Sequence, residues 1–388
     1  MIGIIVEYNP FHAGHAYQIS EIKKIFPAEE IVAVMSGSFT QRGTPAILDK
    51  WTRARLAILG GVDLVLELPF LYAVRSAQDF ARGGVNLLVK IGIDKLAFGA
   101  EVFDVEKLKL AAETFADKNF AEKLKLEMSD GKSYAEAVSK ILSNVAQIDE
   151  KFLKLPNTIL AIEYLRALPK NISPLLIPRD KVISSATSIR HALFEKPVRW
   201  EKISVPSNVL EILQAAELPE EKFLFRPLVT KILTSDLNNL KKIYGMSEGI
   251  EFKLIESARS AKNFSELVSG VVNRRFTISR VKRLLLHFLL NVTAEKISSV
   301  EDYARILACN ERGRKLLKNL KSRLPIVTKV AQHLTSKEIL TGKILEPYKK
   351  TLAFDLLATD LRATLFETPK NWRQDFNSLH SIFDLQIN

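Results

Sequence analysis

Two histidines stand three residues apart near the start of the chain, in the run His12-Ala13-Gly14-His15. They follow an apolar run at residues 2–6 that reads as a buried strand, and a helical pattern follows at residues 15–25. A strand, a glycine-containing turn and a helix together place backbone N–H groups against a phosphate. Imidazoles on such a turn can donate to phosphate oxygens as charge builds in the transition state. The motif therefore predicts nucleotidyl transfer by attack on the α-phosphate of a nucleotide.

This motif is short, and two histidines so close together also fit a metal pair or a turn without chemistry. Its position favours the nucleotide interpretation, because open α/β sheets bind ligands at the carboxyl ends of their strands. On these four residues alone the other two interpretations stay open.

A second polar group, Ser184-Ser185-Ala186-Thr187-Ser188-Ile189-Arg190, follows an apolar run at residues 173–178. Hydroxyl side chains cap a helix well, and the exposed N–H groups of a helix start attract phosphate. Arg190, one turn into that helix, would pair with phosphate oxygens. Alone this group is a good helix cap. Together with the histidines it predicts two helix N-termini that grip one nucleotide from both sides.

The first half of the chain predicts the framework for these groups. Short apolar strands alternate with helical patterns, which is the order of a parallel sheet covered on both faces. Predicted strands cover residues 2–6, 30–35, 63–68, 95–98 and 173–178. Predicted helices cover residues 15–25, 49–59 and 76–91. Residues 105–170 are predicted to be mostly helical, and the helix at 157–167 is the clearest of that stretch. We expect an α/β fold, with a Rossmann-like nucleotidyltransferase domain that binds ATP at residues 1–196.

Beyond residue 196 helical periodicity dominates, so we expect a second, α-helical domain at residues 197–388. Its predicted helices cover residues 207–216, 226–233, 237–243, 250–261, 264–271, 279–290, 300–308, 311–320 and 348–365. The single cysteine, Cys309, falls in a predicted helical run at 304–309 and reads as a buried thiol. One cysteine excludes a disulfide framework and a cysteine-based zinc site.

The net charge of +12 is divided unevenly between the two halves. Residues 1–196 contain 25 basic and 23 acidic residues, whereas residues 197–388 contain 31 and 21. This imbalance favours an anion-binding second half, and nucleic acid is the commonest large anion. A generally basic protein kept soluble by its charge is the alternative. We find no signal segment and no run of 18 apolar residues, so we expect a soluble, cytoplasmic protein without membrane contact.

Two basic runs concentrate this charge. The first contains Arg274, Arg275, Arg280, Lys282 and Arg283, and the second contains Arg312, Arg314, Lys315, Lys318, Lys321 and Arg323. Their spacing lets most of them share a helix face, which favours a phosphate-binding surface over a merely solvated face.

Smaller signals follow the second predicted strand, at Gln41-Arg42-Gly43 and Asp49-Lys50. They lie on the ligand side of the predicted sheet. Arg42 and Lys50 would add positive charge there, so we interpret this segment as a contact to substrate. A flexible surface turn is the alternative.

Longer strings extend these motifs into a family resemblance. The histidine motif and the hydroxyl segment before Arg190 resemble the HxGH nucleotidyltransferase superfamily. The strings VEYNPFHAGH (residues 6–15), MSGSFTQRG (35–43), DLVLELP (63–69), FGAE (98–101) and ACNERGRKLL (308–317) are similar to those of the bacterial tRNA(Met) cytidine acetate ligase family. The first two strings are the specific ones, and the resemblance covers nearly the whole chain.

The resemblance implies a ligase that activates acetate with ATP as acetyl-adenylate. It would then acetylate the exocyclic amine of the wobble cytidine in elongator tRNA(Met). His12, His15 and Arg190 would act in catalysis, with Mg²⁺ on the ATP, no metal site in the protein and no protein partner implied. By position, ATP would contact Val6, Glu7, Tyr8, Asn9, Pro10, Phe11, His12, Ala13, Gly14, His15, Ala16, Tyr17, Gly99, Asn157, Arg179, Ser185, Thr187 and Ser188. The tRNA would contact Arg274, Arg275, Arg280, Lys282, Arg283, Arg312, Arg314 and Lys315.

Two other functions fit parts of this pattern. A small-molecule adenylyltransferase shares the fold and both motifs, but it would not need a basic second half. A non-catalytic RNA-binding protein with a relic nucleotide site would not need His12, His15 and Arg190 intact.

Overall fold

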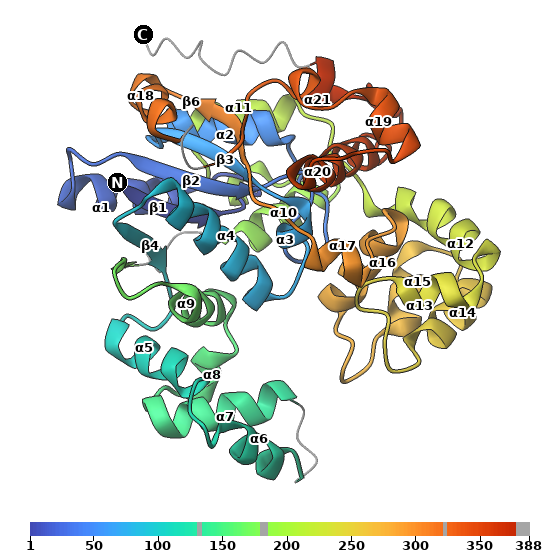
Figure 1. Ribbon diagram of the computed structural model, residues 1–388, viewed down its shortest axis with the longest axis horizontal. Coiled ribbons are helices and arrows are strands. Elements are labelled where there is room, and N and C mark those ends of the chain that lie inside the picture. Colours follow the sequence, from blue (N-terminus) through green and yellow to red (C-terminus); the bar gives the residue numbers. More distant parts are fainter. Residues whose placement is uncertain (130–133, 179–184, 321–323, 378–388) are drawn as a thin grey trace.

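The computed structural model of the chain describes residues 1–129, 134–178, 185–320 and 324–377. A seven-stranded sheet lies at its centre, with strand order β5-β4-β1-β2-β3-β6-β7 (Figure 1). The strands of the first half are parallel and lie where the sequence predicts them: β1 (Ile2–Val6), β2 (Ile31–Ser36), β3 (Leu64–Leu68), β4 (Lys95–Gly99) and β5 (Ser173–Ile177). The expected α/β class is confirmed.

Alternate residues of the central strands face two separate cores. In β2, Ala33 and Met35 join the core formed with α1 (Ala13–Ile25), α2 (Lys50–Leu59), α10 (Ala186–Phe194) and α11 (Ser207–Ala215). Val32 and Val34 face the other core, which is packed with α4 (Ala77–Ile91) and α9 (Pro156–Ala167). The alternation follows from strand geometry, and burial of both faces explains why these strand sequences are continuously apolar.

The sheet does not end with the first half of the chain. Residues 304–309, predicted as helix, form strand β6 (Ala304–Cys309), which pairs antiparallel with β3. The short strand β7 (Ile326–Val327) then pairs parallel with β6. The prediction failed because a short, fully buried apolar run has no periodicity that separates strand from helix. The sheet is therefore mixed, and the expectation of an entirely α-helical second half is wrong.

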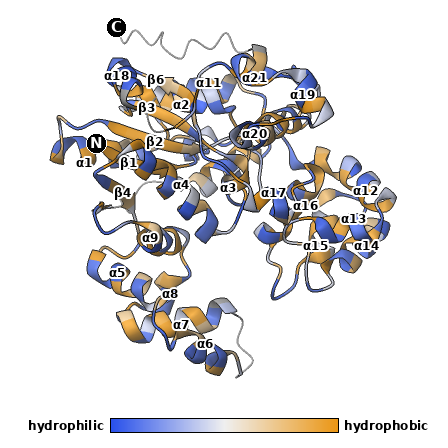
Figure 2. Ribbon diagram, viewed as in Figure 1, coloured by the Kyte–Doolittle hydropathy of each residue, from blue (hydrophilic) through white to orange (hydrophobic). Residues whose placement is uncertain are grey.

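Two helical bodies project from the sheet in Figure 1. The lower one contains α5 (Val105–Thr114), α6 (Phe120–Ser129), α7 (Tyr134–Ala146), α8 (Glu150–Leu153) and α9. The one on the right contains α12 (Phe225–Thr234), α13 (Leu237–Lys242), α14 (Ile250–Ser260), α15 (Phe264–Val271), α16 (Ile278–Leu289) and α17 (Ala294–Ser298). The bounds of α9 and of α12 to α16 agree closely with the predicted helices, and α5 to α8 lie in the stretch predicted as mostly helical. The helix α17 was not predicted, and the helix predicted at residues 300–308 is absent from the described residues. Figure 2 shows the hydrophilic residues of these helices in blue and the hydrophobic central strands in orange.

The end of the described chain returns to the sheet. Helices α18 (Glu311–Leu320), α19 (Ser336–Thr341), α20 (Pro347–Ala363) and α21 (Gln374–Asn377) follow β6, and α20 packs against α3 (Phe70–Ala73). Short 3₁₀ turns lie at Trp200–Lys202, Glu221–Leu224 and Val330–Gln332. In the part of the chain that the structure describes, no helix has the length and apolar character needed to cross a membrane.

Candidate nucleotide site

A cavity of about 950 Å³ opens at the carboxyl ends of β1, β4 and β5. Parallel sheets bind ligands at this edge, because the loops and helix starts that follow the strands converge there. The residues that line it come from several segments of the first half and from the start of α16. Those predicted as ATP contacts or catalytic residues are Val6, Glu7, Tyr8, Asn9, His12, Gly14, His15, Gly99, Asn157, Ser185, Thr187 and Arg190.

The two histidines form the first turn of α1. Gly14 N–H donates to His12 Nδ1 at 3.0 Å, and His12 N–H donates to His15 Nδ1 at 3.2 Å, which makes a reciprocal cap. The rings stack with their centroids 3.7 Å apart. Because each Nδ1 accepts a backbone hydrogen bond, each neutral ring carries its proton on Nε2. The pair therefore offers two Nε2–H donors beside the same cavity, as the phosphate interpretation requires.

The segment before the histidines holds a strained conformation. Tyr8 has φ of +47°, which is rare for a residue other than glycine. Its neighbours are fixed on both sides: Arg53 Nη1 donates to Glu7 O at 2.6 Å, and Arg190 Nη1 donates to Asn9 O at 2.7 Å. Ile47 N–H donates to Asn9 Oδ1 at 2.8 Å. Strain of this kind persists only where the surroundings enforce it, and it is typical of functional sites.

Arg53 was not predicted from the sequence as part of the site. Its side chain is completely buried on α2, and it also donates to the Ser36 and Gly37 carbonyl oxygens at the end of β2. One guanidinium thus ties the ends of β1 and β2 together. Nothing in the spacing of an arginine inside a helix indicates such a role.

Glu7 places a carboxylate in the cavity wall. Gln41 N–H donates to Glu7 Oε1 at 2.6 Å. Burial raises the pKa of Glu7, while the nearby charges of Arg190, Arg53 and Arg42 act in the opposite direction.

The hydroxyl segment starts α10, as predicted. Ser185 is the N-cap, and its Oγ accepts from Ser188 N–H at 3.1 Å. Arg190 Nη2 lies 3.2 Å from Thr187 Oγ1, and burial lowers the pKa of Arg190. Ser188 is not among the residues that line the cavity. Its hydroxyl donates to Ser185 O at 2.8 Å. Arg190 and Thr187 are therefore the members of this segment best placed for phosphate.

Asn157 also lines the cavity, at the start of α9. Its Nδ2 donates to Glu101 Oε1 at 2.7 Å, while Glu101 Oε2 accepts from Thr158 N–H and Oγ1 at 2.7 and 2.9 Å. An ionised carboxylate only accepts hydrogen bonds, so Glu101 fixes the orientation of the Asn157 amide. Glu101 lies two residues after Gly99 in a string that resembles the family, but no role is predicted for it from the sequence.

Several predicted contacts lie elsewhere. Pro10, Phe11, Ala13, Ala16 and Tyr17 are not among the residues that line the cavity. Phe11 is buried and packs against Tyr8, which explains its place in the motif without a ligand. Arg179 lies outside the described residues, as do Lys321 and Arg323 of the second basic run.

The side chains of the first basic run differ in their exposure near the start of α16. Arg274 and Arg275 are exposed, and Arg275 lies 2.8 Å from Glu248. Arg280 is half-buried, stacked over the Phe276 ring. Lys282 instead pairs with Glu221 at 2.6 Å. Arg283 turns inward and donates to Gln41 O at 3.2 Å, and burial lowers its pKa to about 10. Only part of the run is therefore presented to a large anion.

The second basic run lies far from the cavity. Arg312, on α18, donates to Ala28 O at 2.6 Å and lies 3.8 Å from Asp63. Ala28 and Asp63 precede β2 and β3, so this run stands at the amino ends of the parallel strands. Arg314 and Lys315 are exposed on the same helix. The two basic runs are not brought together, and only the first adjoins the cavity.

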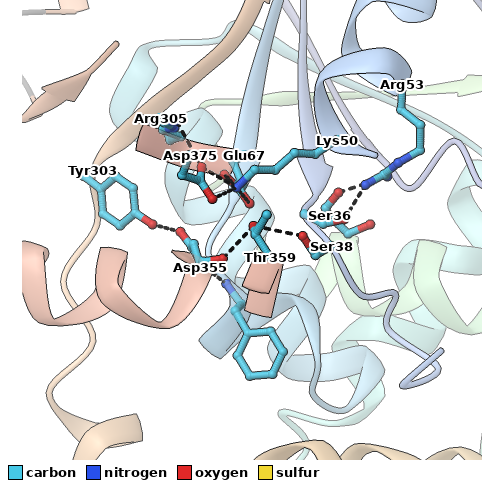
Figure 3. Close-up of polar contacts among 12 residues, drawn as sticks. Ser36, Ser38, Lys50, Arg53, Glu67, Tyr303, Arg305, Asp355, Thr359 and Asp375 are labelled. Carbon is cyan, nitrogen blue, oxygen red and sulfur yellow. Dashed lines mark hydrogen bonds and ion pairs between the residues drawn. The ribbon is translucent and has the colours of Figure 1, made fainter. Parts of the chain in front are cut away.

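Lys50 does not add charge to the cavity, contrary to the sequence interpretation. It is completely buried, with Nζ 2.9 Å from Glu67 and 2.9 Å from Asp375 of α21 (Figure 3). Arg305 pairs with Asp375 at 3.1 Å. The sequence could not reveal this, because Asp375 is more than 300 residues away from its partner. Among the described residues, no cluster of three or more His, Cys, Asp or Glu is arranged to hold a metal ion.

Asp355 extends this buried network (Figure 3). It accepts from Phe70 N–H at 2.6 Å and from the Tyr303 hydroxyl, and burial raises its pKa well above the ordinary value. Thr359 on the same helix, α20, bonds the Ser38 hydroxyl at 3.0 Å. The network therefore connects the end of the chain to the loop that follows β2.

Comparison with known proteins agrees with this arrangement. The model of the HIGH Nucleotidyl Transferase family matches residues 1–377. The chain is 37% identical to a tRNA(Met) cytidine acetate ligase of Caldanaerobacter subterraneus over 99% of both chains. It is 32% identical to the tRNA(Met) cytidine acetate ligase of Halothermothrix orenii over 97% of this chain and 98% of that one. A crystal structure of Thermotoga maritima TmcAL bound with alpha-thio ATP superposes with a TM-score of 0.87, at 31% identity over 98% of each chain.

Proposed function

The chain belongs to the HIGH nucleotidyl transferase family, and we propose that it works as an ATP-dependent tRNA(Met) cytidine acetate ligase. The observation that carries this proposal is that one cavity is lined by His12, His15 and Arg190 and also by the first turn of α16. The exposed residues Arg274 and Arg275 come just before this helix, and the half-buried Arg280 lies in its first turn. A site for nucleotide activation therefore adjoins a surface suited to RNA phosphates.

The first step is the activation of acetate. A carboxylate oxygen attacks the α-phosphorus of ATP, the bond to the bridging oxygen of the β-phosphate breaks, and pyrophosphate leaves with the electron pair. This step needs no protein nucleophile; it needs charge neutralisation and in-line geometry. The Nε2–H groups of His12 and His15, with the Arg190 guanidinium, supply donors for the charge that develops.

The second step transfers the acetyl group to tRNA. The exocyclic amine of the wobble cytidine in elongator tRNA(Met) attacks the acyl carbon of acetyl-adenylate. The bond from that carbon to the phosphate oxygen breaks, AMP leaves with the electron pair, and the amine loses one proton to solvent. We assign the exposed residues Arg274 and Arg275 and the half-buried Arg280 to the tRNA path beside the cavity. Arg312, Arg314 and Lys315 remain candidates for a more distant contact.

Magnesium fits this proposal as a companion of the triphosphate. Mg²⁺ usually keeps several waters and binds substrate phosphates with one or two carboxylates. The described residues offer no dedicated cluster, and Glu7 and Glu101 are the carboxylates among the residues that line the cavity. When bound, the ion neutralises phosphate charge. We place the enzyme in the cytoplasm, where its tRNA substrate is found.

Two measurements test the function. The purified protein should exchange pyrophosphate into ATP only when acetate is present, and it should acetylate a cytidine in tRNA(Met). Nucleoside mass spectrometry of tRNA from a deletion strain should show loss of N4-acetylcytidine. Exchange that depends on a mononucleotide or a phosphopantetheine instead of acetate would favour a small-molecule adenylyltransferase. Absence of any ATP turnover would favour an RNA-binding protein without catalysis.

A further inference from the structure

The loop after β2 makes a tight turn against the second half of the chain. Gly43 N–H donates to Thr40 O at 2.9 Å, Thr40 N–H donates to Thr44 O at 2.9 Å, and the two threonine hydroxyls lie 2.7 Å apart. Gly43 has φ of +73°, and a Cβ there would lie 2.7 Å from the Arg283 backbone nitrogen. Only glycine therefore fits at this position, and the turn is seated directly on α16.

Gln41, two residues before Gly43 in this turn, is held on three sides. Gln41 N–H donates to Glu7 at 2.6 Å, Gln41 O accepts from Arg283 at 3.2 Å, and Gln41 Nε2 donates to Arg75 O at 2.9 Å. These partners belong to the end of β1, to α16 and to the segment before α4. The backbone around position 42 is thus fixed from three directions.

Arg42 is the member of this turn whose side chain is left available. It is exposed and lines the cavity, and no described residue accepts a hydrogen bond from its guanidinium. Its charge lowers the pKa of both Glu7 and Arg190, so the guanidinium lies close enough to act on these two cavity residues. A rigid backbone that presents an available guanidinium to a nucleotide cavity is the arrangement expected of a ligand-binding residue.

The position of Arg42 indicates which ligand it meets. Arg190 and the α10 start follow β5, on one side of the histidine motif, whereas Arg42 follows β2, on the other side. In-line displacement requires the nucleophile and the leaving pyrophosphate on opposite sides of the α-phosphorus. If α10 holds the phosphates that leave, the nucleophile enters from the β2 side.

We propose that Arg42 binds the carboxylate of acetate and presents it to the α-phosphorus; this assignment rests on the proposed function. The planar guanidinium fork matches a carboxylate bidentately. One acetate oxygen forms the new bond to phosphorus as the bond to the β-phosphate oxygen breaks, and no proton moves. The other oxygen becomes the acyl carbonyl and keeps its hydrogen bond to Arg42.

The test measures acetate-dependent exchange of pyrophosphate into ATP for wild type, Arg42→Ala and Arg42→Lys. Losing a hydrogen-bonded charge pair should raise the KM for acetate roughly 10- to 100-fold in Arg42→Ala. Arg42→Lys keeps the charge but not the fork, so its KM should fall between the two. The KM for ATP should change less than the KM for acetate in both variants.

The matched control is Arg55→Ala, which removes an exposed arginine from α2 outside the cavity lining. It should leave both KM values unchanged. A rise in the KM for ATP with an unchanged KM for acetate in Arg42→Ala would mean that Arg42 binds phosphate, and would overturn the assignment. Unchanged kinetics in Arg42→Ala would overturn it as well. If wild type shows no acetate-dependent exchange, the proposed function itself fails.

Discussion

Glu7 and Arg283 lie on opposite sides of a single residue, Gln41. The N–H group of Gln41 donates to the Glu7 carboxylate at 2.6 Å, and its carbonyl oxygen accepts from the Arg283 guanidinium at 3.2 Å. Glu7 follows β1 beside the histidine motif, whereas Arg283 belongs to α16, the helix that begins next to the exposed basic residues. One loop residue therefore links the nucleotide cavity to the proposed RNA surface.

We predict that Arg283→Met slows acetate activation even in the absence of tRNA. The variant removes the hydrogen bond that holds Gln41 from the α16 side, so the loop that carries Arg42 loses a fixed point. Misplacement of reacting groups by about 1 Å can cost up to roughly 100-fold in rate. The measurement is the rate of acetate-dependent pyrophosphate exchange.

The neighbouring substitution Lys282→Met is the control for this variant. It removes a basic residue from the same helix and breaks an ion pair with Glu221, but it makes no contact with Gln41 in the structure. Its exchange rate should stay near that of wild type. Equal losses in the two variants would show that only the stability of α16 matters.

His15→Ala should lower the turnover of acetate activation by roughly 10²–10³-fold, because it removes one donor to the transition state. Binding of tRNA should persist, since the exposed basic residues lie on another segment. His191→Ala, which removes an exposed histidine outside the cavity lining, serves as the control. A His15→Ala enzyme with near wild-type turnover would contradict the role assigned to the motif.

Charge reversal of Arg274, Arg275 and Arg280 together should weaken tRNA binding and flatten its salt dependence. Each lost phosphate contact removes about 0.9 from the slope of log affinity against log salt on a duplex, or about 0.7 on a single strand. Arg283 is left out because it is turned inward. The matched triple reversal of Arg312, Arg314 and Lys315 should change the slope less. The opposite order would move the RNA path to the amino ends of the strands.

Acid should destabilise the protein through His287. Burial lowers the pKa of this histidine from 6.5 to about 4. Between pH 6.5 and about pH 4, His287 is protonated in the unfolded chain but neutral in the folded chain, so the free energy of unfolding falls as pH falls. His287 alone should lower the free energy of unfolding by about 2 kcal/mol between pH 7 and pH 5. Urea unfolding at the two pH values should show a smaller loss for His287→Gln than for wild type, whereas His191→Gln should behave like wild type.

Local pattern was sufficient for much of this architecture. The strand at residues 2–6, the histidine turn and the hydroxyl cap at Ser185 each combine a residue type with a periodicity that few structures satisfy. By contrast, β6 has no periodicity, and its identity depends on β3, to which it pairs from the other half of the chain. The inward orientation of Lys50 and Arg283 could not be predicted for the same reason. Their partners, Asp375 and Gln41, are distant in sequence, and a positive charge alone does not say which way it faces.

The pairing of β6 with β3 also bears on how the molecule is made during translation. When residues 1–196 have emerged from the ribosome, β3 is still an open edge with unpaired N–H and C=O groups. Lys50 at that moment lacks the carboxylate of Asp375, and a buried charge with a partner missing is strongly destabilising. The nascent nucleotide-binding half thus has an unpaired strand edge at β3 until β6 is made. Its Lys50 lacks one of its two carboxylate partners until Asp375 is made.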